Sequence, residues 1–300
     1  MDKSMNTSKG DKILHIVFHI VLILIAVCCV YPFLIIVSSS FTPDSVISKN
    51  GYSAIPREFS VYAYTTIFNN PSAILSAYEV TIITTVVSTV AGLFLESTYG
   101  YVISRRDYRY RQILAFFVFF TMLFNGGLVP TYILISKWLH LKDNILALII
   151  PVVCNAWHIM MLKGFFQSIP TSLIESAKID GAKEFTIFFK IIIPLSKPAL
   201  ATIGLFILLA SWNEWYSSLL YITSENKVKL QYLLMTIMKN IQFLNSGEGA
   251  ALAGSVGAES LPTMSARMAM CVLAAGPIVA VFPFFQKYFV KGITVGAVKG

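Results

Sequence analysis

The sequence predicts an all-α membrane protein with six transmembrane helices. Of its 300 residues, 56% are hydrophobic and only 13% are charged, and the mean hydropathy is +0.71. A soluble chain of this length would carry roughly twice that share of charged residues. Six apolar runs, each about long enough to cross the roughly 30 Å hydrocarbon core of a bilayer, are separated by polar or Pro- and Gly-marked segments. We therefore expect one transmembrane domain over residues 1–300.

The six expected spans follow one another along the chain. They cover about residues 13–37, 80–103, 112–135, 145–162, 199–220 and 268–290. The first run is longer than the apolar region of a secretory signal peptide and no small-residue cleavage site follows it, so we expect it to remain as a helix. The second run is diluted by Thr, Ser and Glu96, which is typical of a helix packed inside a bundle.

The Lys and Arg residues are divided unevenly between two sets of loops. Fifteen of the 23 lie at the two termini, after the second span, and between the fourth and fifth spans, whereas eight lie in the other three loops. By the positive-inside rule, the more basic loops and both termini face the cytoplasm. The net charge of +8 is thus mostly a topology signal, and it no longer gives a reason to expect nucleic-acid binding.

The cytoplasmic segment between the fourth and fifth spans is predicted to form two short helices. Ser172 and Glu175 have the spacing of a capping box, which predicts a helix from Ser172 to Asp180, and Gly181 is typical of a helix stop. Four apolar residues at helical spacing are expected to form one stripe of the second helix: Phe185, Phe188, Phe189 and Ile192. Pro194 is expected to end that helix. On periodicity alone, a pair that only lies on the bilayer or caps the bundle is as good an interpretation as a pair with a function of its own.

The residues of this segment resemble the EAA signature, E-A-A-x3-G-x9-I-x-L-P, of the permease subunits of ABC importers. Ser176 departs from the signature at its second position, and Ile193 departs from its Leu. In that family the loop docks into the cytoplasmic ATPase subunit, so the resemblance implies the same role here. The residues that it assigns to ATPase coupling are Glu175, Ser176, Ala177, Asp180, Gly181, Ile191 and Pro194.

Nearly the whole chain is similar to carbohydrate-uptake permeases of the maltose-transporter type, and most to their polysaccharide and lipoprotein permease branch. The segments that carry this similarity are SRRDYRYR (104–111), FNGGLVPTY (124–132), WNEW (212–215) and QKYFVKGITVGAVKG (286–300). The resemblance implies a subunit of the bacterial cytoplasmic (inner) membrane that imports an oligosaccharide or polysaccharide. It also implies a homologous second permease subunit, two ATPase subunits and an extracytoplasmic solute-binding protein as partners.

The chain contains no GxxxxGK[ST] phosphate-binding loop. We therefore expect ATP and Mg²⁺ to be bound by the separate ATPase subunits, and this chain not to be an enzyme. His15 and His19 have i, i+4 spacing, but no acidic or Cys ligand accompanies them, so no metal site is expected.

Ionisable side chains at membrane depth are candidates for the substrate pathway, because placing one in a bilayer is costly. Glu96 in the second span either lines the pathway, or it pairs with a polar group of the partner subunit or snorkels toward the cytoplasm. A second candidate group combines two indoles, an amide and a carboxylate: Trp212, Asn213, Glu214 and Trp215. Aromatic faces stack on sugar rings while amides and carboxylates bind hydroxyls. An interfacial aromatic belt would explain the two Trp residues but neither Asn213 nor Glu214.

Two glycine-rich segments have two interpretations each. Asn125 is a further pathway candidate. Gly126 and Gly127, which follow it, either permit close helix packing, which we expect, or break the third span at a cavity. Residues 246–258 on the outer side either contact the solute-binding protein, as the resemblance implies, or form a loose linker.

Three alternatives to sugar import remain. The chain can be an ABC importer permease for a different solute, or a proton-coupled secondary transporter in which Glu96 and Glu214 carry protons, although its two halves show no internal repeat. An intramembrane enzyme would need a nucleophile or metal cluster at membrane depth, and the sequence shows none.

Overall fold

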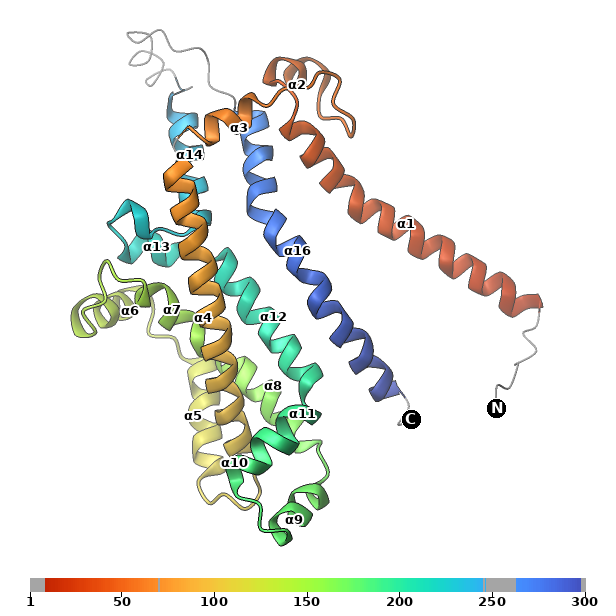
Figure 1. Cartoon of the computed structure of the whole chain (residues 1–300), viewed down its shortest axis with the longest axis vertical. Coiled ribbons are helices and arrows are strands. Elements are labelled where there is room, and N and C mark those ends of the chain that lie inside the picture. Colours follow the sequence, from red (N-terminus) through yellow and green to blue (C-terminus); the bar gives the residue numbers. More distant parts are fainter. Residues whose placement is uncertain (1–8, 70, 245, 247–262, 298–300) are drawn as a thin grey trace. The chain divides into compact units, whose positions relative to one another are not determined.

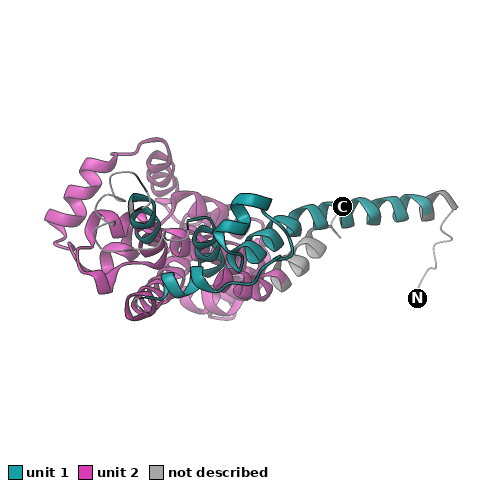
Figure 2. Ribbon diagram, turned by 90° about the horizontal axis from the view of Figure 1, so that it is seen from above, with its two compact units in different colours: residues 1–69, 237–275 teal, residues 70–236, 276–300 magenta. Residues whose placement is uncertain are grey.

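The computed structural model describes residues 9–69, 71–244, 246 and 263–297, and these residues form helices and turns with no strand among them. The chain divides into two compact units, residues 1–69 with 237–275 and residues 70–236 with 276–300 (Figure 2). Three helices are long and apolar enough to cross a membrane, and three bent helix pairs can each form one further span. The predicted helical class and the number of possible spans are thus confirmed for the part of the chain described.

The first unit contains α1 (Lys9–Ser40), α2 (Asp44–Asn50) and α3 (Tyr62–Ile67), with the end of α14 (Leu230–Leu244) and the start of α16 (Met264–Ala297). The apolar side chains of α1 are almost all exposed, as expected for a helix that contacts lipid or another membrane helix. The Asp44 carboxylate accepts hydrogen bonds from the backbone amides of Thr263, Met264 and Ser265, at 2.6 to 2.9 Å. Asp44 thereby caps the first turn of α16 and fixes it to α2.

The second unit is built around α4 (Pro71–Ser104), which packs against α7 (Leu146–Val153), α8 (Ala156–Gln167) and α12 (Lys197–Asn213) (Figure 1). Its polar residues face this packing, as expected for a helix inside a bundle: Thr81, Thr84, Thr85, Ser88, Glu96 and Ser97 are buried. Glycines allow the close approach, since a Cβ at Gly92 would lie 3.1 Å from the carbonyl oxygen of Val153. α4 begins nine residues before the expected start of the second span.

The third span is broken, contrary to our expectation of close packing at the double glycine. α5 (Arg111–Leu123) ends before the Asn125–Gly127 segment, and α6 (Leu128–Ile133), continued by a π-helical turn (Leu134–Trp138), follows at 114° to it. Gly127 has φ +86°, in the left-handed region that favours glycine, and no atom lies within 4 Å of the position of a Cβ there. The glycine therefore serves the turn and not a helix contact.

The fourth and fifth spans are also bent pairs. α7 and α8 meet at 44°, and the pair formed by residues 184–195 and α12 bends by 83°. α12 ends at Asn213, seven residues before the expected end of the fifth span, and α13 (Tyr216–Tyr221) follows as a separate helix. A short 3₁₀ turn (Glu225–Lys227) then leads to α14.

Candidate functional site

The segment assigned to ATPase coupling forms α9 (Thr171–Ile179), α10 (Glu184–Ile187), a π-helical turn (Phe188–Ile192) and α11 (Ile193–Leu195). The first helix and its stop are confirmed, because α9 ends beside Asp180 and Gly181 takes φ +77°. The capping-box prediction is wrong. Pro170 is the N-cap and makes no side-chain cap, so Ser172 lies inside the first turn, where its carbonyl accepts a hydrogen bond from Ser176 Oγ at 2.8 Å. Pro194 lies within α11, and the chain turns after it at Ser196.

The predicted stripe of the second helix is only half correct. Phe188 and Ile192 are buried, but Phe185 is 79% exposed and Phe189 is 50% exposed. The π-helical turn has i→i+5 hydrogen bonds and more residues per turn than an α-helix, so the buried face shifts. Ile187, which was not in the stripe, is fully buried instead.

The buried side of the helix pair packs into the same apolar core as three membrane helices. Ala177 of the EAA segment, 9% exposed, belongs to a core cluster with Tyr101 of α4, Phe166 of α8 and Ile203 of α12. Ile191 and Ile193 lie partly buried against this cluster. A displacement of the pair is therefore transmitted to several spans, because close-packed side chains transmit strain.

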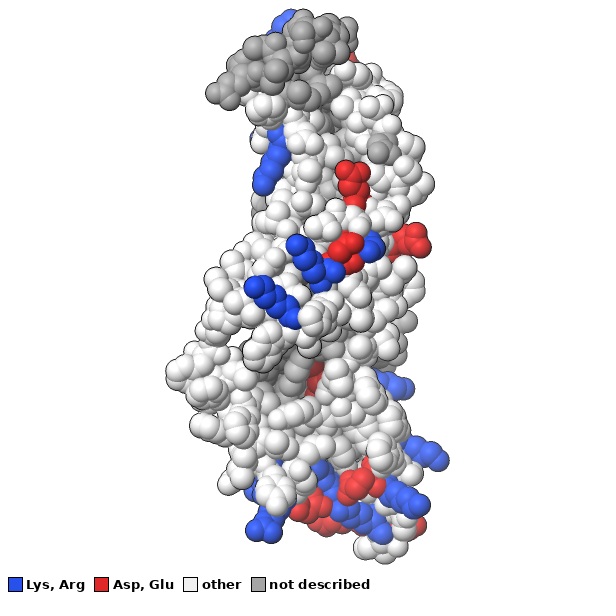
Figure 3. Space-filling view, turned by 90° about the vertical axis from the view of Figure 1, so that its left-hand side faces the viewer, with Lys and Arg blue, Asp and Glu red and all other residues white. Residues whose placement is uncertain are grey.

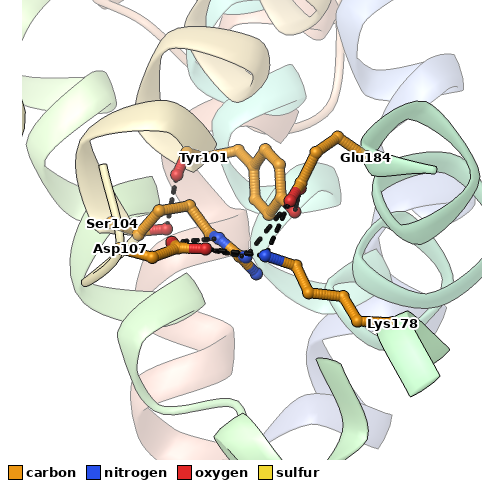
Figure 4. Close-up of polar contacts among 6 residues, drawn as sticks. Tyr101, Ser104, Asp107, Lys178 and Glu184 are labelled. Carbon is orange, nitrogen blue, oxygen red and sulfur yellow. Dashed lines mark hydrogen bonds and ion pairs between the residues drawn. The ribbon is translucent and has the colours of Figure 1, made fainter. Parts of the chain in front are cut away.

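Five polar side chains join the pair to the end of α4, and we call them the coupling cluster: Tyr101, Arg105, Asp107, Lys178 and Glu184 (Figure 4). Lys178 Nζ lies 2.7 Å from Asp107 Oδ2 and 3.1 Å from Glu184 Oε1. Arg105 Nη2 lies 2.8 Å from Asp107 Oδ2 and 3.3 Å from Glu184 Oε1. The Tyr101 hydroxyl donates to Glu184 Oε2 at 2.8 Å. Two cations thus alternate with two carboxylates.

The charges of the cluster stabilise one another in their ionised forms. Hydrogen bonds from Arg105 and then from Lys178 lower the pKa of Asp107 far below its usual range. Hydrogen bonds to Asp107 and then to Glu184 raise the pKa of Lys178. Sequence reasoning missed this cluster, because Asp107 and Lys178 are 71 positions apart and neither belongs to the EAA signature.

The outer side of the pair presents apolar and acidic groups. Ile179 is 87% exposed and Phe185 is 79% exposed. Glu175 is exposed and lines a hollow of about 220 Å³ together with Arg105, Arg106 and Lys178. Ser176, Asp180 and Gly181 are also exposed. Charged side chains of both signs gather at the lower end of Figure 3, where α9 and α10 lie in Figure 1. This end can be contacted by another protein.

The second candidate group, residues 212–215, lies at the break between α12 and α13. Trp212 is buried at the end of α12, Asn213 is exposed and Trp215 is 38% exposed. Asn213 Nδ2 donates to the carbonyl of Leu209 at 2.9 Å, and its Oδ1 accepts from Gln231 Nε2 at 3.4 Å. The break thus exposes an indole beside two amides, and Gln231 was not found from the sequence.

The Glu214 carboxylate has two separate partners at this break. Its Oε1 accepts from the backbone amide of Ser217 at 2.6 Å, in the first turn of α13. Its Oε2 lies 3.7 Å from Nζ of the fully buried Lys229. Lys229 Nζ also donates to the carbonyl of Ser211, in the last turn of α12, at 2.7 Å. An opposite charge therefore meets each of the two helix ends, as the helix dipoles favour.

Glu96 forms a polar site of its own at the break of the fourth span. Its side chain is fully buried; Oε1 accepts from the backbone amide of Asn155 at 2.8 Å, and Oε2 lies 3.1 Å from His158 Nδ1. Asn155 immediately precedes α8, so the Glu96 carboxylate accepts from one of the backbone amides at the start of α8 that have no partner within the helix. Glu96 thus pairs with polar groups of this same chain, a partnership that neither interpretation of the sequence included.

Asn125 performs a similar task at the break of the third span, where its exposed side chain accepts from the backbone amide of Gly127 at 2.8 Å. The breaks between α5 and α6, between α7 and α8, and between α12 and α13 therefore each have a side-chain oxygen that accepts from a backbone amide, as irregular backbone at membrane depth requires. The described residues contain no group of three or more His, Cys, Asp or Glu side chains that could hold a metal ion. The predicted contact segment 246–258 lies, apart from Ser246, outside the described residues.

Comparison with known proteins agrees with this architecture. Residues 90–295 match the family model described as "Binding-protein-dependent transport system inner membrane component". The chain is 42% identical over 280 residues to the polygalacturonan/rhamnogalacturonan transport system permease protein YtcP of Bacillus subtilis, covering 93% of this chain and 96% of that protein. It is 36% identical over 299 residues to the protein LplC of the same organism, covering 99% and 98%.

A solved structure shares the fold. It is a chain of a bacterial ABC transporter involved in the import of the acidic polysaccharide alginate, which matches with a TM-score of 0.76 and 32% identity over 94% of this chain and 99% of that one. The six possible spans, the EAA-like helix pair and these similarities lead to one assignment. The chain belongs to the family of binding-protein-dependent transport system inner membrane components, the permease subunits of ABC importers.

Proposed function

We propose that this chain and a homologous second permease subunit form the membrane pathway of an importer for an oligosaccharide or polysaccharide. A solute-binding protein outside the membrane delivers the sugar, and two ATPase subunits bind ATP and Mg²⁺ and drive transport. This chain supplies no catalytic group. Both termini and the coupling cluster face the cytoplasm, in accord with the distribution of Lys and Arg.

The observation that carries the proposal is the two-sided character of the EAA helix pair. One side is buried among α4, α8 and α12 and tied to α4 by the coupling cluster, while the other exposes Ile179 and Phe185. Apolar side chains on a charged surface are typical of an anchor that inserts into a partner. When the ATPase subunits close, they push on this pair, and the packed core converts the push into rocking of the spans.

The substrate class rests on the break after α12 and on the relatives. Asn213, Trp215 and Gln231 combine the aromatic and amide groups that bind sugars. The relative YtcP is named as a permease protein of a polygalacturonan/rhamnogalacturonan transport system, and the matching solved structure is of a transporter involved in the import of alginate. We assign Trp212, Asn213, Glu214 and Trp215 to the wall of the pathway. Asn125 and Glu96 act there by holding the helix breaks.

The test uses the whole complex in proteoliposomes with its ATPase subunits and solute-binding protein. Gly181→Val should abolish uptake, because a β-branched residue at φ +77° strains the turn, and Glu175→Ala should lower it strongly. Both variants should leave the affinity of the solute-binding protein for sugar unchanged. Full uptake by these variants with normal ATPase assembly would contradict the coupling assignment.

A second measurement separates ATP-driven import from proton-coupled transport. Uptake into proteoliposomes should stop when ATP is withheld from the ATPase side and should persist when the proton gradient is collapsed. The reverse pattern would replace the proposal by a secondary transporter. Uptake of a solute other than a sugar would keep the importer assignment and remove the substrate class.

A further inference from the structure

Lys229 is a charged residue that neither the EAA segment nor the pathway motif accounts for. Its side chain has no exposed surface, which is rare for lysine. Its backbone amide donates to Ser218 Oγ at 3.2 Å, and the next amide, of Leu230, donates to Thr81 Oγ1 of α4 at 2.8 Å. The backbone at Lys229 is thus anchored to both α13 and α4.

The ammonium group has few neighbours that can balance its charge. It donates to the carbonyl of Ser211 at 2.7 Å and lies 3.7 Å from Glu214 Oε2. That carboxylate oxygen is buried and has no hydrogen-bond donor among the described residues. Its interaction with Lys229 is therefore electrostatic. The Glu214 side chain is 17% exposed, whereas Lys229 is not exposed at all. The Glu214 side chain therefore reaches the surface in part, and the lysine does not.

We propose that Lys229 is a specificity-determining residue that neutralises Glu214, so that an acidic glycan can pass the break after α12. The inference rests on the proposed function, because it needs the pathway to run along Glu214. An unpaired carboxylate in a wall of low dielectric repels a passing carboxylate strongly enough to lower flux by about tenfold or more. When Lys229 balances its charge, the same carboxylate still binds hydroxyl groups, and the two side chains together present no net charge to the sugar.

A positioning role alone and a charge-balancing role predict different effects of removing each partner. Lys229→Met leaves a bare negative charge at the pathway, whereas Glu214→Gln leaves a positive one and keeps an oxygen to accept from Ser217. If the pair only holds the two helices together, both variants lose uptake of charged and uncharged sugars in the same proportion. If it balances charge, only the lysine variant loses uptake of an anionic sugar relative to an uncharged one.

The experiment measures ATP-driven uptake of oligogalacturonate and of its uncharged methyl ester by the reconstituted complex. Lys229→Met should lower uptake of the acidic oligomer by about tenfold. Relative to wild type on the same substrate, it should lower uptake of the ester by less than twofold. Glu214→Gln removes a group that binds hydroxyls, so it should lower uptake of both oligomers and should not lower the ratio of acidic to ester uptake. The double variant Lys229→Met/Glu214→Gln should recover that ratio. The yield and melting temperature of each complex show whether a variant has failed to fold.

A loss of the acidic oligomer relative to the ester that is as large in Glu214→Gln as in Lys229→Met would overturn the inference, and so would equal losses of the two oligomers in Lys229→Met. Normal folding of the double variant without recovery of the ratio of acidic to ester uptake would also overturn it. If the wild-type complex imports only uncharged oligomers, the inference fails while the importer assignment stands. If it imports no sugar at all, the substrate class of the proposed function fails as well.

Discussion

Lys178 of α9 lies 2.7 Å from Asp107 in the loop after α4, so an ion pair joins the EAA helix pair to the end of the most buried candidate span. Both side chains are about half exposed, at 42% and 53%, and such pairs typically add less than about 1 kcal/mol to stability. This ion pair therefore contributes little to the stability of the fold, and we expect its main effect to be on how movement of α9 is transmitted to α4.

The first prediction concerns this ion pair. Lys178→Met and Asp107→Asn should each lower sugar-stimulated ATP hydrolysis by about two- to tenfold, with little change in melting temperature, because each removes one link between α9 and α4. In a double-mutant cycle the two effects should be less than additive, since both variants remove the same contact. Independent, additive effects would show that the contact does not contribute to coupling.

The second prediction concerns pH. The pKa of Asp107 is lowered in the folded protein, so its contribution is present above the unfolded pKa of about 4 and is lost as pH falls through the folded value. The pKa of Lys178 is raised, so its contribution is present below about pH 10 and is lost at higher pH. The difference in coupling between wild type and Asp107→Asn should therefore stay constant between pH 5.5 and 9, in ATPase assays. A difference that disappears inside this window would contradict the assigned protonation states.

Much of this architecture follows from local sequence, and the reasons are physical. The polar residues of the second span predicted its buried position, because Thr and Ser at membrane depth need partners. Gly181 predicted the end of α9, because only glycine takes φ +77° without strain. The turn at Gly181 depends on the residues beside it, which the sequence displays directly.

Other features depend on residues far apart in the sequence. Glu96 satisfies the amide of Asn155, 59 positions away, and Lys229 binds the carbonyl of Ser211, 18 positions away. In a hydropathy profile the third, fourth and fifth spans are continuous apolar runs. A break hardly changes the composition of a run, because one side chain is enough to accept from the backbone amide that the break leaves without a helical partner. The π-helical turn at Phe188 likewise changed the buried face without altering the pattern of apolar residues.

The third prediction concerns the packing of α4. A Cβ at Gly100 would lie 3.1 Å from Leu162 Cβ and 3.3 Å from the carbonyl oxygen of Ile159, and backbone cannot move aside easily. Gly100→Ala should therefore destabilise the chain by about 1–3 kcal/mol. Gly164→Ala in α8 is the matched control, because no atom lies within 4 Å of its Cβ position, and it should be neutral or slightly stabilising. Thermal unfolding in detergent compares them, and equal effects would contradict the close approach.

The fourth prediction concerns the buried carboxylate of α4. Glu96→Leu leaves both the Asn155 amide and His158 without their partner and should cost about 1–3 kcal/mol per unsatisfied group. Glu96→Gln keeps an oxygen for the Asn155 amide and should cost less. The two variants are compared by melting temperature and by uptake. Equal losses for Gln and Leu would indicate that the negative charge itself matters, and not the hydrogen bond at the helix break.

The most direct test of the central claim, that the EAA pair couples this chain to an ATPase on the cytoplasmic side, uses single cysteines. Cys28, Cys29, Cys154 and Cys271 are free and exposed, so they are first replaced by Ser or Ala. Ile179→Cys, at a residue 87% exposed, is compared with Ile55→Cys, 76% exposed, in the other unit. In membranes carrying the whole complex, Ile179→Cys should cross-link to an ATPase subunit and react with membrane-impermeant reagents only from the cytoplasmic side, and Ile55→Cys should do neither. Labelling of Ile179→Cys from outside, or no cross-link in an assembled complex, would contradict the account.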